Sequence, residues 1–587
     1  MSAYPFLKEN IEALETYNPP LYAWLSSQDI DEEKLTQCLF KNRWDVLDWK
    51  MENGKGMFEA MMPNFIYNEW KIPDRADTSA TFIIGCNLGY GLNSVLMKTP
   101  DSHKVIVSEP NPVMLLACLG QTDYRPFMKS GKLHFCPVDE GSLMNIIKDL
   151  DLQFVYGKIY LRLDMPSQQL GPEYAKWSAT VRNKMESFTV EMTTLRLKQD
   201  VMVGNELENY SRSVSDGTIS TLKNAGAGLG AVILGAGPSL AEFGPELAEN
   251  PGNAIYVTAL QTLPAVQKTG IKPHFCIGLD YNDSMLRVYD QLDSEWAKDI
   301  PLIYSTKLDH KVLEAYPGPT IPMWTLGGLG TFALNQHEYV FDAGSNVSNT
   351  LNRFLDWCGF NHILLVGQDF AWKGKISHAL GHQNAGATFP ESALVHLKNE
   401  DGEDLTSSIQ YMTSKREMED DLKQIKTPVY NLYGGGALIN GTRNVDMQKV
   451  NMKGILSSAP GSMDYFLTAL NMARTPRPAP VFDSRCQKWN VSIRNATKKL
   501  EKLFRKLSKN QAEIHKTFYD VYFFLRQDPL YLPYLYNEIL DMAGLARAKT
   551  HYEPKDLPHF KRIAKKTIKK VRYMDRCLSL ENKKIAA

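Results

Sequence analysis

The strongest constraint on the fold comes from a stretch near the middle of the chain, AVILGAGPSL (231–240). Its apolar start, bounded by glycine, is typical of a buried parallel strand, and Gly235 and Gly237 allow a tight turn. Pro238 suits the first turn of a helix, where Ser239 offers a hydroxyl beside free N–H groups. A strand, a glycine turn and a helix N-terminus can bind phosphate. An ordinary strand–helix turn that binds nothing has the same pattern, so both interpretations stay open.

After this turn, short apolar runs alternate with helical segments, which predicts a parallel sheet wound by right-handed crossovers. The runs that we interpret as strands lie at 254–260, 274–280, 301–307, 320–326, 362–366 and 429–432. Ligands bind to such sheets at the carboxyl ends of the strands. One crevice is therefore expected to receive the side chains of Gln261, Asp280 and Ser239 beside Gly235.

Three later stretches supply further candidate residues. Ser345 and Asn346 precede a predicted helix, and one of them is expected to be its N-cap. Gln368 and Asp369 follow the most continuous apolar run of the chain, which we interpret as the central strand. The three glycines at 434–436 would let the backbone pass close to a nucleotide, with loop flexibility as the alternative explanation.

The amino-terminal region repeats the strand–glycine–helix pattern. The turn GCNLGYG (85–91) follows an apolar run that begins at Thr81, and a second run, KVIVSEP, ends at Glu109. An acid at the end of the second strand of a Rossmann-like fold often binds a ribose hydroxyl, which would suit a nucleoside such as S-adenosylmethionine. The alternative, which we prefer, is that the glycines serve helix–strand packing and no ligand binds.

Charge is balanced overall but unevenly distributed. The chain holds 66 Lys and Arg and 66 Asp and Glu, yet residues 484–587 hold 24 of the basic and 10 of the acidic residues. This segment has helical periodicity and no recognised nucleic-acid motif. We interpret it as a helical module that docks protein, with the acceptor as one candidate, and not nucleic acid; a solvated charged face is the alternative.

The sequence contains no uninterrupted run of roughly 18 apolar residues, so we expect no insertion into a membrane. The amino terminus lacks the pattern of a signal peptide, and the eight cysteines form no CxxC pair or zinc-like cluster. We therefore expect a cytoplasmic protein. The expected architecture is a Rossmann-like domain at 1–205, a central doubly wound α/β domain at 206–475 and a basic helical domain at 476–587.

The motifs of the central domain resemble those of a known family. VILGAGPSL (232–240), IKPHFCIGLD (271–280), LLVGQDFAWKGKISHA (364–379) and VYNLYGGGALINGT (429–442) are similar to the motility-associated factor (Maf) family of flagellin glycosyltransferases, whose central domain is named MptE-like. The resemblance is strong over about 210–455, and it includes the glycine turn of the amino-terminal region. The central motifs are also similar to bacterial sialyltransferases, so a sialyltransferase-like fold is expected there.

The resemblance implies transfer of a nonulosonic acid, such as pseudaminic or legionaminic acid, from a CMP-sugar to Ser or Thr of flagellin, for flagellar assembly and motility. The SHxxGH pattern of the sialyltransferases is reproduced here and indicates His382 as the base, whereas the GKxSHA pattern of the Maf family indicates His378. Asp369 would orient the base, contact the sugar or cap the next turn.

A CMP-sugar carries one phosphate, whose charge a helix N-terminus and a serine hydroxyl can stabilise without a metal. We therefore expect no metal and no other cofactor, and we interpret Asp280–Asp283 as a sugar or ribose contact, with a DxD-like metal site as the alternative. The predicted donor site comprises Gly235, Gly237, Pro238, Ser239, Gln261, Asp280, Ser345, Asn346, Gln368, Gly434, Gly435 and Gly436.

Two other classes of function remain open. The name of the central domain also suggests a pterin diphosphokinase-like enzyme, which would need ATP and Mg²⁺ because adjacent charged phosphates must be clamped. The third possibility is a non-catalytic module that binds flagellin and has kept the fold.

Overall fold

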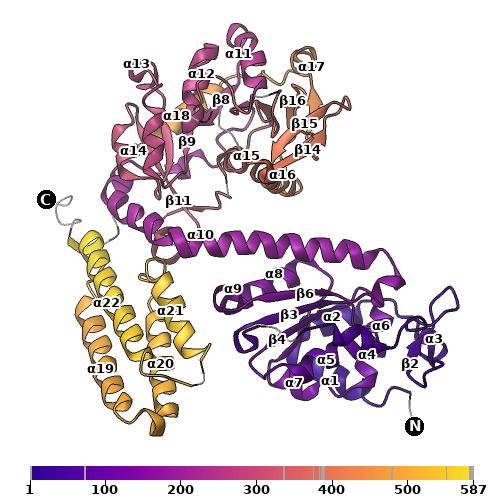
Figure 1. The fold of residues 1–587 in the computed structure, drawn as a ribbon. Helices are drawn as coiled ribbons and strands as arrows, with labels where there is room; N and C mark the ends of the chain where they lie inside the picture. Colours follow the sequence, from indigo (N-terminus) through magenta and orange to yellow (C-terminus); the bar gives the residue numbers. More distant parts are fainter. Residues whose placement is uncertain are drawn as a thin grey trace. The chain divides into compact units, whose positions relative to one another are not determined.

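The computed structural model describes residues 3–71, 74–334, 338–344, 346–374, 376–382, 384, 390–477, 480, 482–549 and 551–580. The chain divides into two compact units, which are described separately (Figure 1). Unit 1 comprises residues 1–197, 496–523 and 538–563, and unit 2 comprises 198–495, 524–537 and 564–587. The predicted division into three domains stays a prediction.

Unit 1 is built on a parallel four-stranded sheet in the order β5-β4-β3-β6. Its strands are β3 (Ala80–Ile84), β4 (Lys104–Ser108), β5 (Leu133–Phe135) and β6 (Ile159–Leu163), and a separate hairpin pairs β1 (Leu39–Lys41) with β2 (Leu47–Trp49). The helices are α1 (Leu7–Tyr17), α2 (Pro19–Ser26), α3 (Glu32–Gln37), α4 (Pro63–Asn68), α5 (Tyr90–Lys98), α6 (Pro112–Gln121), α7 (Arg125–Lys129), α8 (Glu140–Asp149) and α9 (Asp151–Tyr156). The predicted Rossmann-like arrangement is confirmed.

Protein groups fill the place where a Rossmann-like fold would hold a ribose. Glu109 is buried, its carboxylate accepts hydrogen bonds from the backbone N–H groups of Cys86 (2.7 Å) and Asn111 (3.0 Å), and Tyr174 Oη donates a third. Burial raises the pKa of Glu109 to about 7. Both carboxylate oxygens are thus engaged within the protein, which favours the structural interpretation of this glycine turn.

Gly89 tests that interpretation. Its φ is +90°, and a Cβ there would lie 2.4 Å from Tyr124 Oη. We expect Gly89→Ala to destabilise the protein by about 2–4 kcal/mol through backbone strain and the collision. Gly54→Ala is the matched control, because Gly54 has φ +81° and nothing within 4 Å of an added Cβ; it should cost about 1 kcal/mol. Denaturant unfolding would measure the loss of unfolding free energy in both variants. Equal losses would show that the collision with Tyr124 is unimportant.

Unit 2 contains a nine-stranded sheet in the order β12-β11-β10-β9-β8-β7-β13-β16-β17, in which all pairs are parallel. Its strands are β7 (Gly230–Leu234), β8 (Ile255–Ala259), β9 (Phe275–Gly278), β10 (Leu302–Ser305), β11 (Thr320–Thr325), β12 (Val340–Phe341), β13 (His362–Val366), β16 (Val429–Leu432) and β17 (Arg443–Val445). An antiparallel hairpin of β14 (Leu394–Lys398) and β15 (Asp404–Ser408) is inserted after β13. All seven predicted strands are present, and their register pairs Ala231 with Ile363 at the centre.

Different helices cover the two faces of this sheet. Ala231 and Ile233 pack with apolar residues of α15 (Val347–Trp357), α16 (Ile409–Leu422) and α18 (Ser462–Met472). Val232 and Leu234 pack with residues of α11 (Ser239–Glu249), α12 (Leu263–Thr269) and α17 (Met447–Met452). Burial on both faces explains the uninterrupted apolar run of β7. The doubly wound fold predicted for the central region is confirmed.

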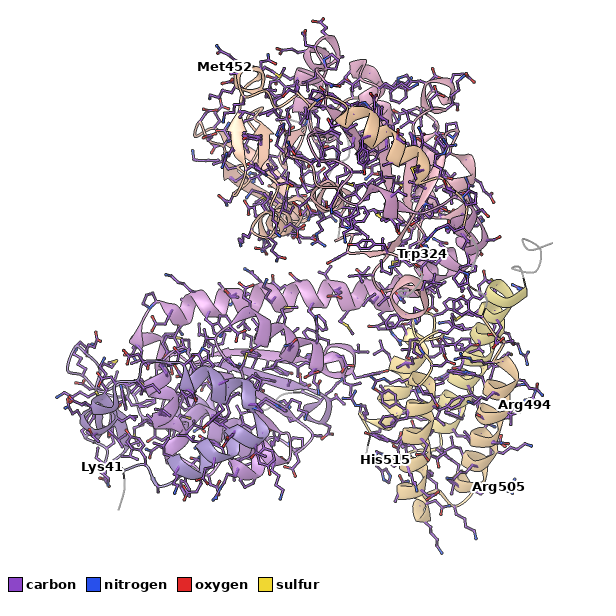
Figure 2. The ribbon with its side chains drawn as sticks, turned by 180° about the vertical axis from the view of Figure 1, so that it is seen from behind. Lys41, Trp324, Met452, Arg494, Arg505 and His515 are labelled. Carbon is purple, nitrogen blue, oxygen red and sulfur yellow. The ribbon has the colours of Figure 1, made fainter. Side chains whose placement is uncertain are left out.

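The remaining helices connect or follow these sheets. The long helix α10 spans Glu173–Ser215, and α13 (Ser294–Ala297) and α14 (His310–Ala315) lie in unit 2. The carboxyl-terminal segment is helical, as predicted, with α19 (Cys486–Phe504), α20 (Gln511–Arg526), α21 (Tyr536–Ala546) and α22 (Asp556–Asp575). Arg494 is exposed on α19, and Arg505 is exposed directly after it (Figure 2). Among the described residues, no helix is long and apolar enough to cross a membrane.

Candidate active site

Three loops meet at the carboxyl ends of the central strands of unit 2. The turn after β7 is tied to the end of β13, since Gly235 N donates to Val366 O (2.7 Å) and Gly237 N donates to Gly367 O (2.8 Å). The glycine loop after β16 joins them through Ala437 N, which donates to Asp369 O (2.8 Å). Chain order reverses between β7 and β13, and such switch points are where open α/β sheets bind ligands.

Asp369 holds the amino-terminal end of α11. Its carboxylate accepts hydrogen bonds from Ser239 N (2.8 Å) and Ser239 Oγ (2.6 Å). Burial raises the pKa of this carboxyl, and the two bonds from Ser239 oppose that shift. The groups assigned to a donor phosphate are thus satisfied by Asp369. The glycine at 237 is explained by the same contact, because a Cβ there would lie 2.4 Å from Asp369 Oδ2.

A cavity of about 240 Å³ opens beside these loops. Pro238 and Asp369 line it together with Ala371, Trp372, Lys373, Gly374, Glu403, Asp404, Leu405 and the three glycines 434–436. Among the described residues, the backbone N–H groups of these glycines have no hydrogen-bond partner. Consecutive free N–H groups suit an anion, and Lys373 beside them forms an ion pair with Glu242 (2.8 Å). The volume is below the 300–1,000 Å³ typical of small-molecule sites.

The two candidate histidines are stacked, with ring centroids 4.3 Å apart. Ala379 N donates to Ala236 O (2.8 Å), which fixes their loop on the turn after β7. Tyr411 Oη on α16 lies 3.0 Å from His378 Nε2, and Asn384 N donates to His382 Nδ1 (3.2 Å). Burial lowers the pKa of both rings, and that of His382 falls to about 3 with a further contribution from His378. Both rings are therefore neutral near pH 7.

The low pKa of His382 makes stability pH-dependent. Its contribution is fully present above the unfolded pKa of about 6.5 and is lost as the pH falls, because protons then bind preferentially to the unfolded chain. At about pH 5 this loss amounts to about 2 kcal/mol. We expect His382→Gln, which keeps a hydrogen-bond acceptor, to reduce the loss of unfolding free energy between about pH 7.5 and 5 by that amount. Denaturant titrations at both pH values would test this, and identical pH dependence in the two proteins would contradict it.

The other predicted residues are distributed along the same edge. Gln368 is buried, and its Nε2 lies where a Cβ on Gly235 would collide (2.2 Å). Gln261 and Asp280 follow β8 and β9, and Asp280 is exposed with Asn282 Nδ2 donating to it (3.2 Å). No described contact joins either residue to Ser239. Asn346 is the N-cap of α15 as predicted, since its Oδ1 accepts from Asn349 N (3.0 Å). Ser345 lies outside the described residues.

The sequence interpretation missed further buried amides on α15. The Asn349 side chain is completely buried, and neither its Oδ1 nor its Nδ2 has a partner among the described residues; the same holds for Asn346 Nδ2 and Asn352 Oδ1. Because α15 leads back into the parallel strand β13, its amino-terminal end lies at the carboxyl edge of the sheet. Buried polar atoms without partners are costly unless a ligand or water satisfies them. The sequence signal for these amides was the repeat of asparagine at every third position, at Asn346, Asn349 and Asn352.

Tyr411 and the β14–β15 hairpin were also missed. Tyr411 follows the polar stretch that forms the hairpin, and such exposed polar strands resemble loops in sequence. In the described part of the chain, no group of three or more His, Cys, Asp or Glu side chains is placed to hold a metal ion.

Comparisons with known proteins found one family model and one solved structure that are similar to this chain. Residues 204–375 match the family model described as 6-hydroxymethylpterin diphosphokinase MptE-like. A Maf glycosyltransferase from Magnetospirillum magneticum AMB-1 superimposes with a TM-score of 0.65 over 97% of each chain, at 14% sequence identity. The chain has the Maf glycosyltransferase fold. No curated protein matches its sequence.

Proposed function

We propose that this Maf-fold protein is a cytoplasmic glycosyltransferase that transfers a nonulosonic acid, of the pseudaminic or legionaminic type, from a CMP-activated donor to Ser or Thr of flagellin, for flagellar assembly and motility. The observation that carries the proposal is the cavity at the β7–β13 switch point, which is lined by glycines with free N–H groups. A stacked pair of neutral histidines lies on a loop that is bonded to the turn after β7. The fold shared with a Maf glycosyltransferase supports the proposal.

In this proposal the N–H groups of residues 434–436 hold the donor phosphate, and Lys373, which is paired with Glu242, lies at the cavity wall. The acceptor hydroxyl oxygen attacks the anomeric carbon, while the bond from that carbon to the phosphate oxygen breaks. CMP leaves with the electron pair, and the hydroxyl proton passes to a histidine of the pair. A single phosphate leaving group needs no metal clamp in this scheme.

The buried amides of α15 are suited to the base of the nucleotide. Asn349 offers one acceptor and one donor group, both unpartnered among the described residues, and cytosine presents a complementary amino group and acceptor atoms. We therefore assign Asn349 to recognition of the cytosine.

This assignment makes an unusual prediction about Asn349→Leu. Because the amide has no partner, leucine should keep the unfolding free energy within about 1 kcal/mol of the wild type, yet weaken CMP binding by roughly tenfold or more. Asn209→Leu is the control, since the Asn209 amide donates to Thr306 O (3.0 Å) and Leu308 O (2.7 Å) and its loss should destabilise the protein. Calorimetric CMP titrations and denaturant unfolding would test both; unchanged CMP affinity would refute the assignment.

Thermal shifts with nucleotides test the proposed function itself. CMP should raise the melting temperature in the presence of a chelator, and purified flagellin incubated with a CMP-nonulosonic acid and this protein should gain the mass of the sugar. A diphosphokinase, which is the function named by the matching family model, should instead be stabilised by ATP with Mg²⁺ and not by CMP. Binding of CMP and flagellin with no mass gain would indicate the non-catalytic module.

A further inference from the structure

The strand β6 has a free edge. It pairs with β3 on one side only, and it is the last strand of the unit 1 sheet. Ala80 N donates to Lys158 O (2.9 Å) and Asp164 N donates to Ile84 O (2.9 Å), so the even-numbered residues of this segment bond to β3. The N–H and C=O groups of the odd-numbered residues point outward. Within the described ranges, those of Ile159, Leu161 and Leu163 have no partner.

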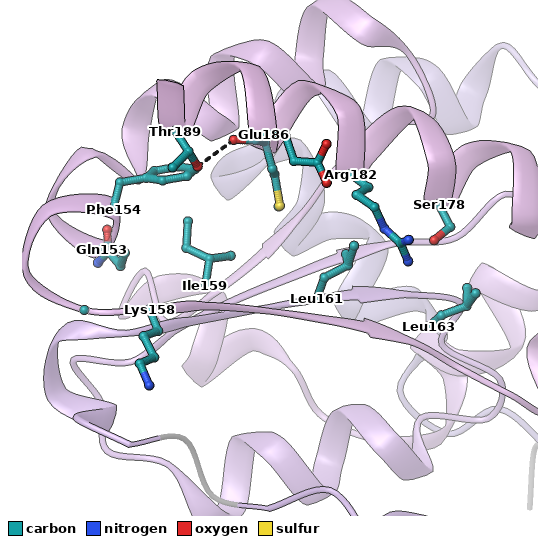
Figure 3. Close-up of a pocket in the computed structure, with 12 residues that line it drawn as sticks. Gln153, Phe154, Lys158, Ile159, Leu161, Leu163, Ser178, Arg182, Glu186 and Thr189 are labelled. Carbon is teal, nitrogen blue, oxygen red and sulfur yellow. Dashed lines mark hydrogen bonds between the residues drawn. The ribbon is translucent and has the colours of Figure 1, made fainter. Parts of the chain in front are cut away.

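A groove of about 560 Å³ runs along the same strand (Figure 3). Ile159, Leu161 and Leu163 line one side, and α10 forms the other. The residues that α10 contributes are Ser178, Arg182, Met185, Glu186 and Thr189. Every second residue of β6 thus offers both an outward backbone pair and an apolar side chain to the groove.

The groove also carries an unpaired positive charge. Arg182 is exposed, and it has no ion pair or hydrogen bond among the described residues. Lys158, at the start of the groove, forms a long ion pair with Asp74, in which Nζ and Oδ2 are 3.8 Å apart and both side chains are exposed. A charge such as Lys158 at an exposed edge strand discourages unspecific pairing between sheets. Arg182 on α10 favours a partner of complementary charge.

We propose that the free edge of β6 binds an extended segment of the polypeptide acceptor, which adds a strand to the sheet. Outward N–H and C=O groups that repeat along a strand are matched by another strand, which gains affinity from main-chain bonds and specificity from alternate side chains. The segment places an apolar side chain in the groove against Leu161 and a carboxylate beside Arg182. The inference rests on the proposed function, because it names where the acceptor docks.

Leu161→Pro tests the main-chain pairing. Proline removes one outward N–H group but no bond to β3, and edge strands tolerate proline at such positions. Purified flagellin monomer is titrated into the full-length protein without donor. We expect Leu161→Pro to weaken flagellin binding by about tenfold or more, whereas Leu161→Val, which keeps the N–H group, binds almost as the wild type. Arg182→Glu should also weaken binding, and Glu186→Ala should not.

Two further measurements keep this test separate from the proposed function. Both Leu161 variants should show wild-type melting temperatures and bind CMP normally, since the donor site lies in unit 2. Flagellin should slow hydrogen exchange at the amides of residues 159–163. Unchanged exchange, or equal flagellin binding by the proline and valine variants, would overturn the docking site and leave sugar transfer standing. If the wild-type protein does not bind CMP, the proposed function is refuted instead.

Discussion

Replacing His378 with alanine is expected to reduce the rate of sugar transfer by roughly 10²–10⁴-fold, while CMP affinity changes little. Ser377 Oγ lies 3.1 Å from His378 Nδ1, and Tyr411 Oη lies 3.0 Å from Nε2. When the tyrosine oxygen accepts the Nε2 proton, Nδ1 keeps its lone pair, and rotation of the serine hydroxyl frees it for the acceptor. The structure therefore favours His378 over His382 as the proposed base.

His382 is the weaker candidate for two reasons. Its Nδ1 lone pair accepts the Asn384 N–H, and burial holds its pKa at about 3, so it binds a proton poorly near neutrality. We expect His382→Gln to lower transfer less than His378→Ala does.

Single-turnover rates with saturating donor would test this order. His396→Ala, which removes an exposed histidine of β14, is the matched control and should transfer normally. Tyr411→Phe should give an intermediate loss, because it removes the group that fixes the tautomer. A wild-type rate for His378→Ala, or a larger loss for His382→Gln, would show that the base is assigned wrongly.

The fold was predictable where burial leaves a continuous trace in the sequence. The strands β7 and β13 are covered on both faces, so nearly every residue is apolar. The hairpin of β14 and β15 has mixed exposed residues and leaves no such trace, so it was missed. Short strands such as β12 and β17 depend on their neighbours for pairing and carry little local signal.

The candidate site was predictable as a set of loops but not as a set of bonds. Gly235, Asp369 and Gly436 were placed correctly at the ends of strands, because parallel strands share a carboxyl edge. Asp369 accepts a hydrogen bond from Ser239 N, and these two residues are 130 positions apart in the sequence. The burial of Asn349 depends on elements that pack around α15. Sequence patterns show where a strand ends, whereas the partners of a polar group are fixed by tertiary packing.

Replacing Asp369 with alanine is expected to lower the unfolding free energy by about 3–4 kcal/mol and to abolish CMP binding. The change leaves two buried groups of Ser239 without an acceptor and releases the end of α11 from β13. Gly237→Val should act similarly, since its Cβ would displace the same carboxylate. Asp369→Asn keeps the shape, and the Ser239 hydroxyl can accept from the amide, so it should cost only about 1–2 kcal/mol.

The graded series separates a positioning role of Asp369 from a catalytic one. Asp404→Ala is the control, because Asp404 lines the same cavity while its side chain is 89% exposed; it should unfold as the wild type does. Denaturant unfolding, CMP titration and transfer rates are measured on each variant. If Asp369 positions the loops, stability and CMP affinity fall together, and Asp369→Asn recovers most of both. If Asp369→Asn keeps both but loses transfer by roughly a hundredfold, the carboxylate acts on the reacting groups, because a residue that only positions the loops would have lowered stability and CMP affinity as well.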